Sequence, residues 1–342
     1  MKRFALFLLV MGFSAGAYAE TLFTPEAFHA AQVNGDKILL HFHADWCPTC
    51  RAQISALSHL EKEGALNDIV FLTVDYDKEK EFEKTMHVTE QATFIAFYGT
   101  VETGRVTGIT GEADIKEFID KSLATVNLNE QLRRMRDSAQ RMPPEKKKIL
   151  DEAIENLRQS GLMEKALKVG QTMPAFSLPN AHGQIIRLQD LLKNGPLIVT
   201  FYRGSWCPYC NVQLNSYQRH LADFRRLGAN LVAITPEKPD LTLLTEEKKE
   251  LKFEILTDKD NELARKLGLV YGVTGELKAL YKQLGVDLEK SQGNSDWQLP
   301  VPATYIVSKT GKVVYAFVNV DYTRRADPQD LLRALEQLGE HP

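Results

Sequence analysis

Cysteine is scarce in this chain. Only four cysteines occur among 342 residues, and they form two Cys-x-x-Cys pairs, Cys47/Cys50 and Cys207/Cys210. A disulfide framework that stabilises a small exported protein uses many cysteines scattered along the chain. Two cysteines separated by two residues close too small a loop to restrict the unfolded chain appreciably. The pairs are therefore poor structural staples and good candidates for reversible redox chemistry.

Long hydrophobic runs are also missing. The longest, from Phe4 to Phe13, holds about 10 residues, whereas a helix that crosses a bilayer needs about 20. This run follows a basic amino terminus and precedes the small residues Ala17-Tyr18-Ala19, which is the order of a cleavable secretory signal. We expect a signal peptide at residues 1–19 rather than a retained anchor, a periplasmic protein and no stable membrane anchor.

Positive charge is not in excess. The 42 Lys and Arg residues are outnumbered by 45 Asp and Glu, which gives a net charge of −3. Proteins that bind nucleic acid usually carry a strong basic patch. The short basic run at residues 146–148 is typical of a solvated helix face. We therefore expect no nucleic-acid partner.

Two stretches of the chain share one pattern. Residues 37–44 and 197–202 are apolar and β-rich, and each stretch leads into a Cys-x-x-Cys pair that is followed by apolar residues at helical spacing. The two pairs lie 160 residues apart. Further strands alternate with helices after each pair, which predicts α/β domains whose sheets are covered on both faces. An internal duplication is the economical description.

The two copies differ in length. The second holds about fifty extra residues, mostly within residues 268–299. This insertion, with Tyr271, Tyr281 and Trp297, either covers the second site as a lid or only packs. Between the copies the chain is charged and helical in period, so we expect a solvated helical connector, with packing against one domain as the alternative.

The position of each pair predicts its chemistry. A cysteine at the start of a helix directs its sulfur at free backbone N–H groups, which stabilise the thiolate. By this argument Cys47 and Cys207 are the nucleophiles, and Cys50 and Cys210 resolve the mixed disulfide. A proline at the first helical position supplies the right φ at no cost in hydrogen bonds. The prolines in that place are Pro48 and Pro208. The residues before the pairs, Trp46 and Trp206, either flank the sulfur or pack.

The first pair carries a family resemblance. Trp46-Cys47-Pro48-Thr49-Cys50 after an apolar strand resembles the active-site segment of thioredoxins and related periplasmic thiol reductases, over about residues 21–123. Thioredoxins place a buried Asp where this chain has His41, which either serves as a base instead or packs. They also place a cis-proline where this chain has Ala92, which leaves the partner range of the domain open.

The second pair carries a different resemblance. Residues 201–210, Phe-Tyr-Arg-Gly-Ser-Trp-Cys-Pro-Tyr-Cys, resemble the active-site segment of the peroxiredoxin-like branch of the alkyl hydroperoxide reductase and thiol-specific antioxidant family, over about residues 168–338. In that register Cys210 takes the peroxidatic place and Cys207 the place of a threonine. Arg203 replaces the family's proline. The resemblance thus leaves open which of the two cysteines attacks first.

Downstream, Pro302-Ala303-Thr304 is similar to the family's Arg-Ala-Thr segment. Pro302 stands where peroxiredoxins keep an arginine that polarises the peroxide, and instead looks like the cis-proline of thioredoxin-type reductases. The missing positive charge would have to come from Arg203, Arg324 or Arg325. Peroxide reduction and plain disulfide exchange remain equal alternatives for this half.

These observations predict two thioredoxin-fold domains in tandem: a thioredoxin-like domain at 20–124, a helical linker at 125–167 and a peroxiredoxin-like domain at 168–342. We expect an antioxidant thiol-disulfide oxidoreductase whose first half relays electrons to the second, from a membrane thiol donor to a peroxide or protein disulfide. One alternative is a reductase or isomerase of exported proteins without peroxidase activity. Another is a metal-binding protein that uses the cysteine pairs. We expect no organic cofactor and no metal.

Overall fold

The computed structural model describes residues 21–124, 127–139 and 142–340. The predicted signal peptide lies outside these residues. Within them, none of the helices combines the length and the apolar character that crossing a membrane requires.

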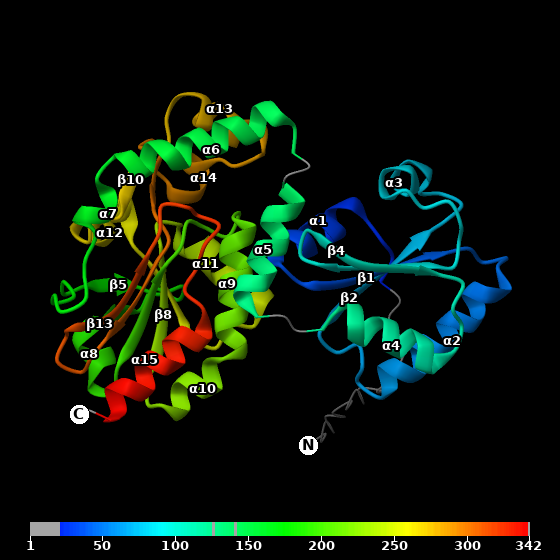
Figure 1. Cartoon of the computed structure of the whole chain (residues 1–342), viewed down its shortest axis with the longest axis horizontal. Helices are drawn as coiled ribbons and strands as arrows, with labels where there is room; N and C mark the ends of the chain where they lie inside the picture. The colour runs from blue at the N-terminus through cyan, green and yellow to red at the C-terminus, as the bar shows by residue number, and fades with distance from the viewer. Residues whose placement is uncertain (1–20, 125–126, 140–141, 341–342) are drawn as a thin grey trace, which may run out of the picture.

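The first domain is a four-stranded sheet between two helical layers (Figure 1). Its strand order is β2-β1-β3-β4, with β1 parallel to β2 and antiparallel to β3. Alternate residues of β1 face opposite layers: Phe42 packs with α1 and α3, and Leu39 packs with α2 and α4. The elements are α1 (Pro25–Asn34), β1 (Lys37–His43), α2 (Pro48–Lys62), β2 (Ile69–Asp75), α3 (Lys80–Met86), β3 (Thr93–Tyr98), β4 (Val101–Thr107) and α4 (Glu112–Ser122).

The second domain is built on a five-stranded sheet of order β13-β12-β7-β8-β9. Two small two-stranded sheets, β5-β6 and β10-β11, flank it. Its elements are β5 (Ser177–Pro179), β6 (Ile185–Arg187), α8 (Leu188–Lys193), β7 (Leu197–Phe201), α9 (Pro208–Arg219), α10 (Leu221–Arg226), β8 (Asn230–Thr235), α11 (Pro239–Lys249), β9 (Glu254–Thr257), η1 (Lys259–Asn261), α12 (Glu262–Lys266), β10 (Val270–Gly272), α13 (Gly275–Gln283), α14 (Leu288–Gln292), β11 (Gln298–Pro300), β12 (Ala303–Val307), β13 (Val313–Val318) and α15 (Pro328–Glu340).

The two sheets repeat one topology, as the predicted duplication requires. β7 pairs in parallel with β8 and antiparallel with β12, as β1 does with β2 and β3. In both halves the helix that carries the cysteines follows this inner strand directly. The fold class, two thioredoxin-like α/β domains in tandem, is confirmed. The second copy adds β9 at the sheet edge and the segment that contains α13 and α14.

The connector differs from the favoured expectation of a solvated linker. It consists of α5 (Leu128–Ala139), α6 (Pro144–Gln159) and α7 (Leu162–Lys165). Leu128, Leu132 and Met135 of α5 are buried in the hydrophobic core beside α9. With Gln131, these residues recur at spacings of three and four and give α5 one buried face. The helix therefore packs like a core helix. The alternative, packing against a domain, holds for α5.

The domains meet where α1 ends and α9 begins (Figure 1). Asn211 Nδ2 donates to the Val33 carbonyl at 2.6 Å, and Asn215 Nδ2 donates to the Asn34 carbonyl at 2.8 Å. Lys249 Nζ donates to the same Asn34 carbonyl at 2.8 Å. These contacts lie at the amino end of β1. The interface is therefore adjacent to the second cysteine pair and at the opposite end of β1 from the first.

Candidate active sites

The first pair lies where β1 passes into α2. Cys47 is the residue before the helix, Pro48 takes the first helical position, and Cys50 lies in the first turn, as predicted. The backbone N–H of Cys50 donates to Cys47 Sγ at 3.2 Å. Both sulfurs are buried, Cys47 being 2% exposed and Cys50 fully enclosed. Trp46 does not pack over them: it is 58% exposed and its Nε1 donates to Asp77.

The two sulfurs of this pair differ in acidity. Burial opposes ionisation of Cys47, but hydrogen bonds from the Cys50 thiol and from the N–H groups of Cys50 and Thr49 outweigh it and lower the pKa of Cys47. Burial and the hydrogen bond to Cys47 raise the pKa of Cys50 to about 11. Cys47 is therefore the more acidic of the two sulfurs, as its place at the helix start predicts.

His41 lies behind this pair on β1 and is fully buried. Its ring stacks on Phe94 with centroids 4.7 Å apart, and its Nε2 lies 2.8 Å from Gln53 Oε1. Burial lowers the pKa of His41 to about 3. A base this weak takes no proton from Cys50 near neutral pH, so the geometry favours the packing alternative for His41.

Ala92 occupies the place of the family's cis-proline. It packs against Cys47 and Cys50 with a backbone φ of +60°, and its N–H donates to the Phe42 carbonyl at 2.8 Å. A positive φ is costly for a residue that has a Cβ. The loop that faces the sulfurs is thus held in a conformation that proline cannot adopt.

The second pair lies at the equivalent junction of β7 and α9, with Pro208 again at the first helical position. Cys207 is 1% exposed and Cys210 is fully enclosed. In contrast to Cys47, Cys207 accepts no hydrogen bond from the helix N-terminus. Arg325 Nη2 instead donates to Cys210 Sγ at 3.3 Å.

Acidity in this pair runs the other way. Burial opposes ionisation of Cys210, but the hydrogen bond from the Cys207 thiol and the charges of Arg325 and Arg203 outweigh it and hold the pKa of Cys210 well below its usual range. Burial and the bond to Cys210 raise the pKa of Cys207 well above it. The electrostatics therefore favour Cys210, which holds the peroxidatic place of the family register, over Cys207, the nucleophile expected from helix position.

The structure separates the three arginine candidates. Arg325 contacts the Cys210 sulfur and is 3% exposed. Arg203 is 2% exposed, and its guanidinium lies 4.3 Å from the Tyr322 ring and 4.8 Å from the Trp206 ring. Arg324 faces solvent and pairs with Asp321. Arg325 thus supplies the charge that Pro302 cannot, and Arg203 adds to it.

Pro302 does not match the feature it resembles. The described residues contain no cis peptide bond, so the proline enters β12 in the trans form. Thr304 does not touch the sulfurs either. Its hydroxyl lies 3.2 Å from the Tyr217 hydroxyl, which donates to the carbonyl of Ala326, the neighbour of Arg325. Thr304 therefore braces the turn that holds Arg325 in place.

The insertion reaches the second site. Tyr281 of α13 accepts a hydrogen bond from Arg203 and lies edge-on to Trp206, with ring centroids 5.7 Å apart. Tyr281 also packs with Trp297 and Leu299, so the segment has a core of its own. The two alternatives for the insertion therefore both apply: it packs around its own core and it also contacts the second site. Trp206 and Tyr281 thus lie against Arg203, whose charge helps to lower the pKa of Cys210.

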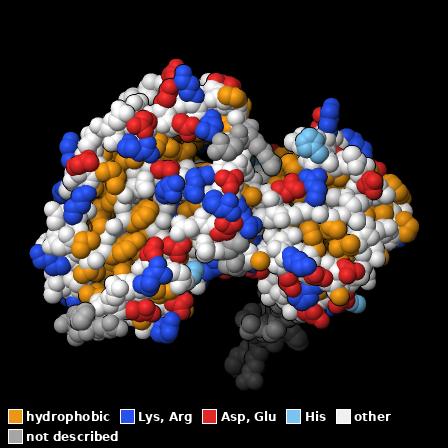
Figure 2. All heavy atoms as spheres, viewed as in Figure 1, with side chains coloured by type: hydrophobic (Ala, Val, Ile, Leu, Met, Phe, Trp, Pro, Cys, Tyr) orange, Lys and Arg blue, Asp and Glu red, His pale blue; other side chains and the backbone are white. Residues whose placement is uncertain are grey.

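An open cleft of about 560 Å³ lies on the other side of Arg325. Arg133 and Arg136 of α5 line it together with Arg324 and Arg325. Figure 2 shows basic side chains gathered over α5 on this face. Arg325, whose guanidinium contacts the Cys210 sulfur, lines this cleft but is itself only 3% exposed.

Sequence reasoning missed two functional candidates. Glu237 is 1% exposed and accepts hydrogen bonds from the Ser205 N–H and hydroxyl, at 2.7 and 3.0 Å. Burial raises the pKa of Glu237 to about 7. The second is His43, whose imidazole lies beside His41 and Cys50. Its two-residue spacing from His41 on a strand was the available signal, because such residues share a face.

The chain was compared with known proteins. The thioredoxin family model matches residues 20–121, and the AhpC/TSA family model matches residues 169–316. A putative peroxiredoxin of Mycobacterium tuberculosis is 31% identical over 157 residues, which cover 46% of this chain and 88% of that protein. The chain belongs to the peroxiredoxin family. As a peroxiredoxin with a thioredoxin domain in front, it is a thiol-dependent oxidoreductase. The suspected fusion is confirmed, in the predicted order.

Other matches fall on the same halves. Peroxiredoxin Bcp of Escherichia coli K12 is 29% identical over 103 residues, 30% of this chain and 65% of that protein. Among solved structures, the peroxidoxin BcpB of M. tuberculosis covers 50% of this peroxiredoxin chain and 98% of its own, at 19% identity and a TM-score of 0.40. The structure of Trxlp from Edwardsiella tarda covers 29% of this chain and 97% of its own, at 29% identity and a TM-score of 0.28.

Proposed function

We propose that the second domain reduces hydroperoxides with Cys210 as the peroxidatic cysteine. The Cys210 thiolate attacks the terminal peroxide oxygen, which leaves a Cys210 sulfenic acid and releases an alcohol, or water from hydrogen peroxide. Cys207 then attacks the sulfenic sulfur, which forms the Cys207–Cys210 disulfide and releases water. The contact between Arg325 Nη2 and Cys210 Sγ carries this proposal, because it stabilises the thiolate and sets a cation beside the attacked oxygen.

The enclosure of the site supports a small substrate. Both sulfurs are at most 1% exposed in the reduced form, which favours a small substrate over a folded protein disulfide. Reduction by another domain then requires that formation of the Cys207–Cys210 disulfide exposes one of the two sulfurs. A hydroperoxide group is small enough to enter beside Arg325. The named relatives, peroxiredoxins, agree with a peroxide substrate.

We propose that the first domain reduces the disulfide formed in the second. The Cys47 thiolate attacks the Cys207–Cys210 disulfide, and Cys50 resolves the mixed disulfide, which restores both second-domain thiols and leaves a Cys47–Cys50 disulfide. A dithiol donor must then reduce that disulfide. We propose a membrane thiol donor and a periplasmic location, which rest on the apparent signal at residues 1–19. Amino-terminal sequencing of the mature protein tests the signal.

The arrangement of the domains favours relay between two molecules. Contacts with the second domain lie at the amino end of β1, and Cys47 follows its carboxyl end. Because a strand rises about 3.3 Å per residue, β1 sets the first pair about 20 Å beyond the interface. α5 packs its buried face against α9 of the second domain and also contacts β4 of the first, which favours this arrangement. The two pairs of one chain therefore do not meet without separation of the domains.

Single-equivalent consumption of peroxide by the reduced full chain, with Cys47 and Cys50 replaced by Ser, tests the second-domain chemistry. We expect reduced Cys207→Ser in this background to consume one equivalent of hydrogen peroxide and to hold a sulfenic acid that dimedone traps. We expect Cys210→Ser to consume less than about 1% of that amount, since only the thiolate attacks. The reverse pattern would assign the peroxide chemistry to Cys207.

Concentration dependence tests the relay. Peroxide turnover per chain should rise with protein concentration. A mixture of Cys47→Ser/Cys50→Ser with Cys207→Ser/Cys210→Ser chains, each at the wild-type concentration, should recover most of the wild-type rate. A rate per chain independent of concentration, with an inactive mixture, would instead show relay within one molecule.

A further inference from the structure

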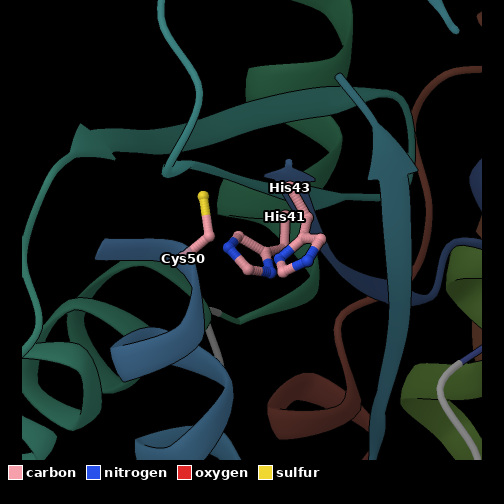
Figure 3. A group of neighbouring side chains, drawn as sticks. All are labelled: His41, His43 and Cys50. Carbon is pink, nitrogen blue, oxygen red and sulfur yellow. The ribbon is translucent and has the colours of Figure 1, made fainter. Parts of the chain in front are cut away.

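A cluster of two imidazoles and a thiol lies beside the first cysteine pair. Figure 3 shows His41 and His43 of β1 next to Cys50 of α2. One nitrogen of each ring and Cys50 Sγ lie within 4.8 Å of one another. The imidazole ring centroids of His41 and His43 are 5.3 Å apart, and the planes are inclined at 68°. His41 and Cys50 are fully buried, and the His43 side chain is 15% exposed.

Hydrogen bonding fixes which nitrogen of His41 is free. Gln53 Nε2 donates to the carbonyls of Ala92 and Ile109, at 3.0 and 2.9 Å, so Gln53 Oε1 must face the ring as an acceptor. His41 therefore carries its proton on Nε2. Its Nδ1 holds a lone pair and is buried with no hydrogen-bond partner.

His43 has the same pattern. Its Nε2 lies 3.3 Å from Asp45 Oδ1, and a carboxylate oxygen can only accept, so the proton belongs on Nε2. His43 Nδ1 is also buried without a hydrogen-bond partner. Buried polar atoms are rarely left unpaired. A ring whose far N–H is held by an oxygen acceptor, with the near nitrogen bare, is the usual state of a histidine that binds a metal.

We propose that His41 Nδ1, His43 Nδ1 and Cys50 Sγ form a binding site for monovalent copper. Thiolate and imidazole donors suit Cu(I). On binding, Cys50 loses its proton to solvent and forms the copper–sulfur bond, with no change in oxidation state. The charge decides between Cu(I) and Zn(II): one thiolate neutralises Cu(I), whereas Zn(II) with the same donors leaves a net positive charge in a buried site.

The site is distinct from the one that simple dithiol chelation would make. Among the described residues that group with these donors, Cys47 is absent. Copper binding therefore needs a reduced Cys50 and not Cys47. Since Cys50 is also the resolving cysteine proposed above, bound copper blocks formation of the Cys47–Cys50 disulfide. Binding itself does not depend on the proposed peroxide chemistry.

Competition for Cu(I) tests the site in the full chain. Cys207→Ser/Cys210→Ser removes the second pair, and the chain is reduced with a phosphine and titrated anaerobically with Cu(I) held by bicinchoninate. We expect one Cu(I) per chain. Cys50→Ser should abolish binding, and His43→Ala should weaken it at least about tenfold. Cys47→Ser should change it less than about threefold, and the exposed His59→Ala should leave it unchanged.

X-ray absorption counts the donors without relying on a variant's folding. Two nitrogens and one sulfur around copper are expected. Two sulfurs around copper would overturn the site in favour of dithiol chelation. So would a result in which Cys47→Ser loses binding and His43→Ala keeps it. Equally tight, His43-dependent binding of Zn(II) alone would overturn the choice of Cu(I).

Discussion

The two cysteine pairs have the same spacing, the same proline and the same place before a helix, yet they are polarised in opposite directions. In the first pair the outer cysteine, Cys47, is the more acidic. In the second it is the inner cysteine, Cys210. The Cys-x-x-Cys motif thus provides two sulfurs within reach of each other. It does not decide which of them is the nucleophile.

Neighbours outside the motif make that decision. At the first pair no cation contacts either sulfur among the described hydrogen bonds, and the N–H of Cys50 favours charge on Cys47. At the second pair, Arg325 arrives from the turn after β13 and contacts Cys210. A guanidinium near a buried sulfur outweighs one backbone N–H, because a full charge acts strongly in a site of low dielectric.

Alkylation rates test most directly which cysteine of each pair is more acidic, and we expect the largest effect in this experiment. In the reduced protein near neutral pH, we expect Cys47 to react at least about 100-fold faster than Cys50, since only the thiolate is nucleophilic. In the second domain Cys210 should react before Cys207. Peptide mass spectrometry after a short pulse of iodoacetamide separates the four sites. Faster alkylation of Cys207 than of Cys210 would contradict the proposal that the two pairs are polarised in opposite directions. Denatured protein serves as the control, because a rate difference that persists there does not come from the fold.

The loops that face the pairs also differ, and Ala92→Pro probes this. Proline would require φ near −65° in place of +60° and would remove the bond from Ala92 N–H to the Phe42 carbonyl, so we expect a loss of about 3 kcal/mol or more in the free energy of unfolding. Ala92→Gly, which accepts a positive φ, should stay within about 1 kcal/mol. Urea unfolding measures both. An equally stable proline variant would show that the family's loop fits here.

Arg325→Gln should remove the polarity of the second pair. Without the guanidinium, the pKa of Cys210 rises, so its alkylation and its reaction with peroxide at neutral pH should fall about 10- to 100-fold. The matched control is Arg324→Gln, because Arg324 is the exposed neighbour that pairs with Asp321. Equal losses in the two variants would mean that general positive potential, and not the contact with sulfur, sets the acidity.

Local patterns predicted most of the fold. The apolar runs at 37–44 and 197–202 became the inner strands β1 and β7, and both prolines stand at the first helical position as expected. These features depend on alternation and on backbone geometry within a few residues. Such local features are expected in any sheet that is buried on both faces.

Contacts between distant segments were beyond that reasoning. Arg325 meets Cys210 across 115 residues of sequence, and its neighbour Arg324, identical in type, points to solvent. From the sequence, Arg324 and Arg325 were equally good candidates for the missing positive charge. Likewise α5 looked solvated because its mean character is polar, although Leu128, Leu132 and Met135 are buried. Which side chain is buried depends on packing partners that no local window contains.

Glu237 allows a further test of how the surroundings of the two pairs differ, with a smaller expected effect. It is a buried carboxyl near the second pair. Its pKa is raised to about 7 by burial, from 4.5, so folding takes up a proton between these values. The stability due to the neutral carboxyl is therefore complete below pH 4.5 and is lost as pH rises to 7, by up to about 3 kcal/mol. Glu237→Gln, which can still bond Ser205, should lose less stability than wild type between pH 5 and 8. The exposed Glu336→Gln should follow wild type. If urea midpoints of Glu237→Gln also follow wild type, the carboxyl is already ionised in the folded state and Cys210 faces a second negative charge.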